Sequence, residues 1–253
     1  MNKNVLITGA SSGIGRALAF ELASRGDNLA LCARRVDTID KIKGEVLAKH
    51  PERRVETRAL DVTRYADVPR VIDDVAQAFG RLDTIIANAG IGSTGLIGMG
   101  HFEQDRAVIE TNVIGAMATI DAAVTLFRQQ GSGHIVVISS VAAMRGLPGS
   151  GSYSASKAAI ATFADSARVE LHGTPIRVTT LYPGYIDTPI NQDMGDRRPF
   201  LIDVEKGARI VADLMKHGVQ ESTVPVWPWN AVSRVLKLMP TALLARQVAP
   251  RKR

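Results

Sequence analysis

Short apolar runs alternate with stretches of helical periodicity along almost the whole chain. Each run is long enough for one β-strand. Because strands and helices alternate, the pattern predicts an α/β fold with a parallel, doubly wound sheet of about seven strands, right-handed crossovers and helices on both faces. The predicted strands cover residues 4–8, 28–33, 55–60, 82–87, 134–138, 176–181 and 222–226.

Helices are expected where apolar residues recur every three or four positions. The first follows a glycine-rich turn, places Ile14, Leu18 and Leu22 on one face and ends before Gly26. The longest covers residues 105–130 and carries an apolar stripe along its length. Further helices are expected over residues 67–79, 158–169 and 204–217.

The length and composition fit a single domain. The chain has 253 residues, and its hydrophobic content of 45% is that of an ordinary globular protein. The single cysteine, Cys32, excludes an internal disulfide, and the five histidines lack metal-ligand spacing, so no metal site is predicted. No apolar run approaches the roughly 18 residues of a membrane span. Since the first strand begins by Asn4, we expect no signal peptide and a cytoplasmic location.

Charge is distributed unevenly along the sequence. All 25 acidic residues lie at or before Glu221, and the charged residues beyond it are all basic. The basic residues of this tail account for the formal net charge of +6, so the body is neutral and shows no basic stripe. We therefore expect no nucleic-acid partner. The tail residues are Arg234, Lys237, Arg246, Arg251, Lys252 and Arg253.

A glycine-rich turn joins the first strand to the first helix. Gly9, Gly13 and Gly15 fall within seven residues, in the layout of a nucleotide-binding strand–turn–helix unit. Glycines let the backbone approach a pyrophosphate, and the helix N-terminus offers N–H donors and partial positive charge. A tight turn without a ligand is the alternative, and three glycines in this position favour the nucleotide.

The end of the second strand carries information on the cofactor. Folds that prefer NAD place an acidic residue about 20 residues past the glycines, where it binds the ribose 2′-hydroxyl. Here Ala33 is followed by Arg34 and Arg35, whose guanidinium groups suit the 2′-phosphate of NADP. The alternative is a solvated arginine pair at the start of a loop. The nearby acid Asp37 weakens the NADP prediction, because an acid in this region is typical of folds that prefer NAD.

The stretch from Ser140 to Lys157 carries the candidate catalytic chemistry. Tyr153 and Lys157 are four residues apart and would share one face of a helix. A phenol has an unperturbed pKa of about 10, and a nearby ammonium would move this pKa toward the working pH. Ser140, at the end of the preceding strand, would hydrogen-bond the substrate oxygen. Alone, a tyrosine and a lysine at this spacing usually mark only a solvated helix face.

Several candidate segments follow predicted strands, so they should gather at one edge of the sheet, where such folds bind ligands. Asn112, in contrast, falls in mid-helix beside the apolar stripe, where a buried amide needs partners. It would either pin two elements together or hold a water or a lysine at a site. The segments at the edge are residues 9–15, 33–35, Asp61, 88–90, Ser140 and 183–188.

Together these motifs resemble the short-chain dehydrogenases/reductases (SDRs), over residues 4 to about 226. The segment Thr8 to Gly15 is similar to the family's cofactor motif, residues 88–90 to its N-A-G motif and residues 183–188 to its nicotinamide-contacting segment. The resemblance implies a Rossmann-type domain, residues 1–226, that binds NADP(H) through Gly9, Ser11, Ser12, Gly13, Ile14, Gly15, Arg34, Arg35, Asp61, Val62, Asn88, Ala89, Gly90, Tyr153, Lys157, Pro183, Gly184, Ile186 and Thr188.

The resemblance also implies a catalytic tetrad of Asn112, Ser140, Tyr153 and Lys157. In reduction, Tyr153 would give its proton to the carbonyl oxygen as hydride arrives from NADPH, and Ser140 would polarise that carbonyl. Lys157 would lower the pKa of Tyr153 and hold the nicotinamide ribose. Asn112 would anchor a water on a proton path to Lys157.

Residues 227–253 depart from the pattern of the family's fatty-acid-synthesis ketoreductases. Trp227 and Trp229, the only tryptophans in the sequence, precede an apolar stretch with basic residues, 231–244. Such a segment either packs on the body or a subunit interface, which we favour, or lies on an anionic membrane surface. An apolar wall formed here with Met144, Leu147, Tyr185 and Met194 would suit a lipophilic substrate.

The sequence therefore predicts a cytoplasmic NADP(H)-dependent enzyme that reduces a ketone or aldehyde, or oxidises the matching alcohol. Its substrate would be a lipophilic small molecule, and it would form a homodimer or homotetramer. An NAD-linked alcohol dehydrogenase is a narrower alternative. A non-catalytic NAD(P)-sensing protein belongs to a different class. The intact Ser140, Tyr153 and Lys157 argue against that class, because a sensor needs no proton donor.

Overall fold

A computed structural model of the protein describes residues 2–194 and 198–245. Within these residues, seven parallel strands form one sheet in the order β3-β2-β1-β4-β5-β6-β7, which confirms the predicted strand number and direction. Each observed strand begins and ends within two residues of its prediction. The strands are β1 (Asn4–Thr8), β2 (Asn28–Ala33), β3 (Val55–Ala59), β4 (Thr84–Ala87), β5 (Gly133–Ile138), β6 (Ile176–Pro183) and β7 (Glu221–Val224).

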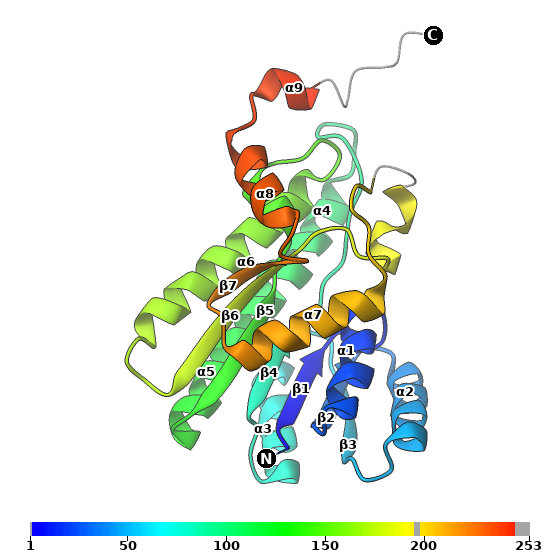
Figure 1. The fold of residues 1–253 in the computed structure, drawn as a ribbon, viewed down its shortest axis with the longest axis vertical. Coiled ribbons are helices and arrows are strands. Elements are labelled where there is room, and N and C mark those ends of the chain that lie inside the picture. The colour runs from blue at the N-terminus through cyan, green and yellow to red at the C-terminus, as the bar shows by residue number, and fades with distance from the viewer. Residues whose placement is uncertain (1, 195–197, 246–253) are drawn as a thin grey trace.

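Helices cover both faces of the sheet, so the doubly wound α/β arrangement is also confirmed (Figure 1). One face carries α1 (Gly13–Ser24), α2 (Val36–Lys49) and α7 (Val204–His217). The other carries α3 (Asp67–Phe79), α5 (Ala116–Gln130) and α6 (Gly151–Glu170).

Strand residues enter the two cores alternately, because successive side chains of a strand point to opposite faces. In β1, Val5 and Ile7 pack on the side of α1, and Leu6 packs on the side of α3. In β5, Ile135 and Val136 divide between the cores in the same way. Burial on both faces explains why the strands read as continuous apolar runs in the sequence.

Three helical regions differ from the prediction. The helix α6 begins at Gly151, seven residues before the predicted start at residue 158. The helix α2 lies in a stretch to which the sequence analysis assigned no element, although Ile39, Ile42 and Val46 form its buried face. The helix predicted over residues 105–130 is divided into α4 (Phe102–Ile109), a π-helix (Glu110–Gly115) and α5. Such wider turns are frequent at functional sites, and apolar periodicity does not reveal them.

One helical stretch of the described residues is long and apolar enough to cross a membrane by length and mean hydropathy, although polar residues interrupt its apolar sequence. It is Phe102–Gln130, whose most apolar 18-residue window has a mean hydropathy of 1.4. However, 44% of that window is buried inside the protein, and α5 within it packs against α3 in the core. We therefore interpret this stretch as a core helix.

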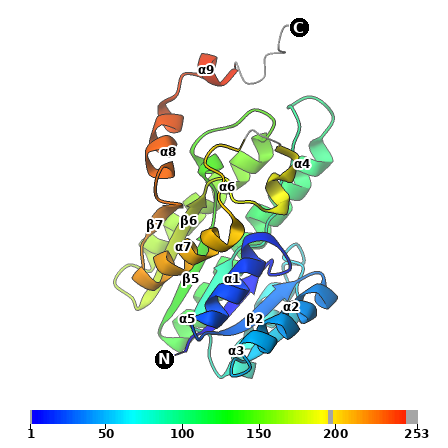
Figure 2. The same cartoon turned by 45° about the vertical axis from the view of Figure 1, so that its right-hand side comes forward.

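After β7 the chain leaves the α/β body. The helices α8 (Trp229–Leu238) and α9 (Thr241–Ala245) project from the end of the molecule opposite the start of β1 (Figures 1 and 2). The first residue of α8, Trp229, is buried against Val141 and Tyr182, so the root of this extension is packed on the body.

Candidate active site

A cavity of about 580 Å³ opens at the carboxyl edge of the sheet. It is lined by segments that follow β1 to β6, and the strand order reverses between β1 and β4, where α/β sheets bind ligands. Of the predicted cofactor and catalytic residues, all of which are described, only Gly15 and Asn112 do not line this cavity. The fold thus brings together the segments that the sequence analysis placed at one edge.

The glycine turn packs too closely on the end of β4 to carry side chains. Gly9 has a φ of +68°, and a Cβ there would lie 2.7 Å from the Cα of Ala89. A Cβ at Gly15 would lie 2.5 Å from the carbonyl oxygen of Gly9. Among the described residues no side chain caps the start of α1, so its first N–H groups remain to bind an anion. These features fit a dinucleotide pyrophosphate.

Thr8 organises the turn, a role that the sequence analysis did not assign to it. Its buried hydroxyl donates to the carbonyl of Ile86 (3.2 Å) and accepts hydrogen bonds from the N–H groups of Asn88 (3.0 Å) and Ala89 (3.1 Å). Asn88 in turn donates through Nδ2 to the carbonyl of Thr8 at 2.9 Å. These bonds join the ends of β1 and β4 beneath the cavity.

Both candidate phosphate-binding arginines are exposed and line the cavity at the end of β2. The guanidinium of Arg35 donates to the Ser11 hydroxyl at 3.1 Å, which holds it over the glycine turn. Asp37, the acid that weakened the NADP prediction, is not among the residues that line the cavity. The charge presented at this end is therefore that of Arg34 and Arg35.

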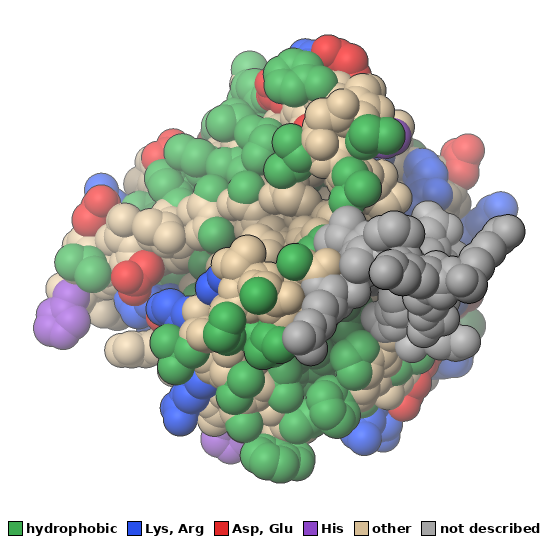
Figure 3. All heavy atoms as spheres, turned by 90° about the horizontal axis from the view of Figure 1, so that it is seen from above, with side chains coloured by type: hydrophobic (Ala, Val, Ile, Leu, Met, Phe, Trp, Pro, Cys, Tyr) green, Lys and Arg blue, Asp and Glu red, His purple; other side chains and the backbone are tan. Residues whose placement is uncertain are grey.

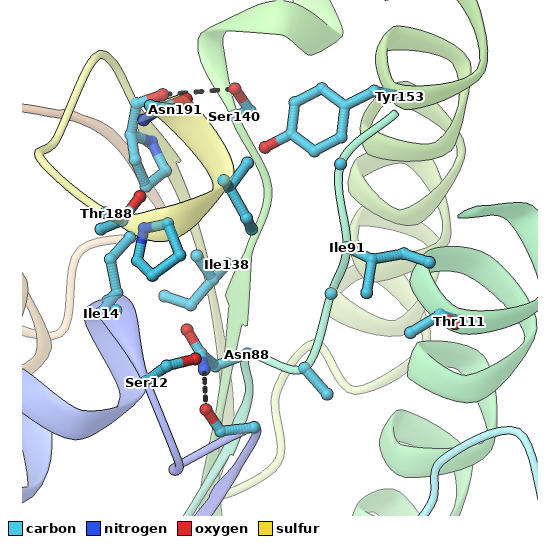
Figure 4. A pocket seen from close by; sticks show the side chains of 18 of the residues that line it. Ser12, Ile14, Asn88, Ile91, Thr111, Ile138, Ser140, Tyr153, Thr188 and Asn191 are labelled. Carbon is cyan, nitrogen blue, oxygen red and sulfur yellow. Dashed lines mark hydrogen bonds between the residues drawn. The ribbon is translucent and has the colours of Figure 1, made fainter. Parts of the chain in front are cut away.

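Ser140 and Tyr153 face the same space from two elements (Figure 4). Ser140 follows β5 and caps a short 3-10 helix, Val141–Met144. Its hydroxyl accepts from the N–H of Ala142 (3.1 Å) and donates to the carbonyl of Pro183 (3.4 Å). Tyr153 lies in the first turn of α6. Although part of its surface faces the cavity, desolvation by surrounding atoms raises the pKa of Tyr153, and hydrogen bonding to Ser140 opposes this rise.

Lys157 lies one turn further along α6 and is almost fully buried. Its ammonium donates to the carbonyl of Ile138 at 2.9 Å and lies 5.7 Å from the centre of the Tyr153 ring. Burial lowers the pKa of Lys157 to about 8, which leaves it mainly charged at neutral pH. The expected lowering of the Tyr153 pKa by this ammonium is not the net result here, because desolvation of the phenol has the larger effect.

Asn112 lies in the π-helix and is buried away from the cavity. Its Oδ1 accepts from the N–H of Ile91 (2.8 Å), and its Nδ2 donates to the carbonyl of Ile91 (2.9 Å) and the hydroxyl of Ser156 (3.1 Å). Ser156 donates to the carbonyl of Tyr153 at 2.8 Å. The amide of Asn112 therefore pins the loop after β4 to α6. This corresponds to the first role considered for it, in which it joins two elements. Spacing alone could not identify Ile91 and Ser156 as its partners.

Apart from Lys157, the part of the cavity next to Ser140 and Tyr153 is lined by apolar or uncharged residues. The charged residues that line the cavity, in the described chain, are Arg34, Arg35, Asp61 and Lys157. Met144, expected in the apolar wall, instead packs against the cluster around Trp229, and the side chain of Met194 is outside the described residues. The uncharged lining includes Ile91, Val141, Leu147, Ser150, Tyr185 and Ile190.

Comparison with known proteins supports the same family as the motifs. The family model described as short chain dehydrogenase matches residues 3–199. The chain belongs to the short-chain dehydrogenase family. A curated relative of this SDR is an uncharacterised oxidoreductase of Mycobacterium tuberculosis, 37% identical over 245 residues, with 96% of both chains covered.

Two further similarities are to proteins whose names state an activity. The SDR described here is 40% identical over 191 residues to 11-beta-hydroxysteroid dehydrogenase 1A of Arabidopsis thaliana, covering 75% of this chain and 54% of that one. Its fold is similar to that of an alcohol dehydrogenase from the archaeon Thermococcus sibiricus, solved with 5-hydroxy-NADP. The TM-score is 0.79 at 30% identity, and 88% of this chain and 96% of that chain are covered. The protein is thus an SDR oxidoreductase with the NAD(P) cofactor typical of the family.

Proposed function

We propose that this SDR is an NADP(H)-dependent oxidoreductase that reduces a ketone or aldehyde of an uncharged, lipophilic small molecule, or oxidises the matching alcohol. The observation that carries this proposal is one cavity with Arg34 and Arg35 at one end and Ser140, Tyr153 and Lys157 beside its uncharged lining. The cytoplasmic location and the homodimer or homotetramer stay predictions of the sequence.

The arginine pair supports NADP over NAD. A 2′-phosphate carries charge and several acceptor oxygens, which two guanidinium groups can bind in pairs. Arg35 is already oriented by Ser11, and no carboxylate at the end of β2 is among the lining residues to bind a free 2′-hydroxyl instead. The Thermococcus sibiricus relative was solved with an NADP derivative, which agrees with this preference.

The catalytic side chains support proton transfer to a carbonyl oxygen. Bound NADPH would supply the hydride. Ser140 and Tyr153 would both hydrogen-bond the substrate oxygen, and Tyr153 would transfer its phenolic proton to it. A raised pKa keeps Tyr153 protonated at neutral pH, which suits a proton donor in the reductive direction. Lys157 would bind the cofactor ribose and place positive charge beside the phenol as it loses its proton.

The uncharged lining supports a neutral substrate. A charged substrate group next to Ile91, Val141 and Leu147 would lose hydration without gaining an opposite charge, which is costly. The Arabidopsis relative is named for a hydroxysteroid, which agrees with a lipophilic substrate. We therefore propose an apolar ketone, aldehyde or alcohol as the substrate class.

The cofactor assignment is tested by titrating the protein with NADPH and NADH and following binding by fluorescence. We expect NADPH to bind more tightly, and Arg34→Ala or Arg35→Ala to weaken NADPH binding on the order of tenfold while sparing NADH, since each variant removes charge-assisted hydrogen bonds. Arg70→Ala, a change of an exposed arginine on α3, is the matched control. Equal affinity for both cofactors would reject the NADP assignment, and an NADPH-binding protein inactive on a carbonyl panel would be a sensor.

A further inference from the structure

Large apolar side chains are exposed on the loop between β4 and α4. Ile97 is 90% exposed, and Phe102, the first residue of α4, is 73% exposed. Leu96 and Met99, on the same loop, are also exposed. Single exposed apolar residues are normal on a protein surface, whereas several together mark an interaction site.

Two other segments at the same end of the molecule expose apolar side chains as well. The chain between β6 and α7 contributes Ile190, Phe200 and Leu201. The C-terminal extension contributes Trp227 and Leu238, which are 77% and 83% exposed. We call the full set the apolar rim: Leu96, Ile97, Met99, Phe102, Ile190, Phe200, Leu201, Val226, Trp227, Val235, Leu238 and Leu243.

Contacts connect these segments to one another around the cavity. The N–H of Gly95 donates to the carbonyl of Gly149 (3.0 Å), joining the first loop to the segment before α6. The ring of Phe200 packs edge-on against Trp229 at 5.9 Å. Arg145 donates to the carbonyl of Lys237 (3.3 Å), and Ile190 of the rim itself lines the cavity. Figure 3 views this end, where hydrophobic side chains gather in several patches.

The charges near the rim are of two kinds. On α8, Arg234 and Lys237 are exposed beside Val235 and Leu238, and no acidic residue follows Glu221 in the sequence. Near the other two segments, Glu103 pairs with Arg106 and Asp187 with Arg198. Asp105 accepts a hydrogen bond from the hydroxyl of Ser93, and Asp203 accepts one from the N–H of Lys206. On the extension, in contrast, no acidic residue offsets Arg234 and Lys237, so its charge is positive.

We propose that the apolar rim is a docking surface for an anionic lipid membrane, with the mouth of the cavity turned toward the bilayer. A helix with exposed leucine and valine beside arginine and lysine is suited to the interface of an anionic membrane. A second copy of the chain would instead bring the positive charges of two α8 helices together. The docking does not depend on the proposed reaction, although it would give a lipophilic substrate a direct route into the cavity.

Co-sedimentation of the full-length protein with vesicles tests the proposal. The vesicles are phosphatidylcholine alone, or phosphatidylcholine with phosphatidylserine. We expect substantial binding only with phosphatidylserine, and a loss on the order of tenfold for Ile97→Ser/Leu238→Ser and for Arg234→Glu/Lys237→Glu, since each removes one of the two attractions. Val169→Ser is the matched control, because Val169 is 70% exposed on α6 but is not part of the rim.

Circular dichroism and NADPH binding verify that the variants keep their fold, whether or not they turn over a substrate. Binding that is independent of phosphatidylserine and equal in all variants would overturn the proposal. So would a failure to bind vesicles combined with self-association that the rim variants abolish, because the rim would then be an interface between copies.

Discussion

Tyr153 combines two environments that work in opposite directions. Its surroundings desolvate the phenol and raise its pKa, whereas hydrogen bonding to Ser140 favours the phenolate. A donor that stays protonated until the carbonyl accepts hydride needs the first effect, and stabilisation of the resulting phenolate needs the second. The position of Tyr153 at the start of α6 supplies both.

We predict that Tyr153→Phe loses catalytic turnover by about 10²- to 10⁴-fold, because it removes only the proton donor. Binding of NADPH should change little, since the ring and Lys157 remain in place. Steady-state kinetics and a binding titration measure the two effects separately. Tyr65→Phe, on an exposed turn outside the cavity, should match the wild type. Unchanged turnover in Tyr153→Phe would reject the proposed role.

Lys157 is a charged group in a place that disfavours charge. Burial lowers its pKa from an ordinary value of 10.5 to about 8, so the native state binds this proton less tightly than the unfolded chain does. Below pH 8 the lysine is charged in both states and its burial destabilises the fold fully. Between pH 8 and 10.5 that destabilisation fades, because the native state releases the proton while the unfolded chain still binds it, and it is gone once the unfolded chain releases the proton too.

Lys157→Met should therefore raise the free energy of unfolding at pH 7 by about 2 kcal/mol, after allowance for the lost hydrogen bond to Ile138. The gain should shrink as the pH rises from 8 to 10.5. Urea denaturation at several pH values measures it, and Lys206→Met, at an exposed position, is the control. A variant less stable than wild type at pH 7, with a gap that does not vary with pH, would contradict this account.

At the scale of elements, α8 is coupled to the wall of the cavity. A Cβ at Gly184 would lie 2.1 Å from Nε1 of Trp229, so the indole lies directly against the backbone that follows β6. Tyr185 packs edge-on against the same indole at 5.7 Å, and both Gly184 and Tyr185 line the cavity. The extension therefore supports the part of the site next to the catalytic residues.

Substitution of Trp229 and of Trp227 compares the stability contributed by a buried and an exposed tryptophan at the root of α8. Trp229→Ala should lower the free energy of unfolding by about 3 kcal/mol, since it leaves a cavity beneath α8. Trp227→Ala, two residues away but 77% exposed, should change it by less than about 0.5 kcal/mol. Chemical denaturation measures both variants. Similar values for the two would mean that α8 is not held by Trp229.

At the scale of the whole molecule, the sequence predicted the sheet well because its strands are buried on both faces. Runs such as Val5–Ile7 have no exposed side to interrupt the apolar pattern, and the glycine turn and Tyr153 segment follow such runs. Parallel topology then places those segments at one edge, which is why spacing could select most of the residues that line the cavity.

What the sequence could not predict depends on contacts between distant segments. The apolar periodicity of the sequence does not reveal the π-turn at Asn112. The side chain of Asn112 forms hydrogen bonds with Ile91 and Ser156, which belong to other elements. The direction of the Tyr153 pKa shift was missed for a similar reason: desolvation depends on how neighbouring elements close around the ring. The role of Thr8 required the register between β1 and β4.

The opposite placement of β1 and α9 has a practical consequence for handling the protein. The start of β1 lies at the end of the molecule opposite α9 (Figure 1), whereas α9 carries Leu243 of the rim. An affinity tag or a surface linkage attached ahead of Asn2 would leave the mouth facing solution. The same attachment after α9 would place foreign chain next to the apolar rim, so a sensor chip or column built on this protein should hold it by its first residues.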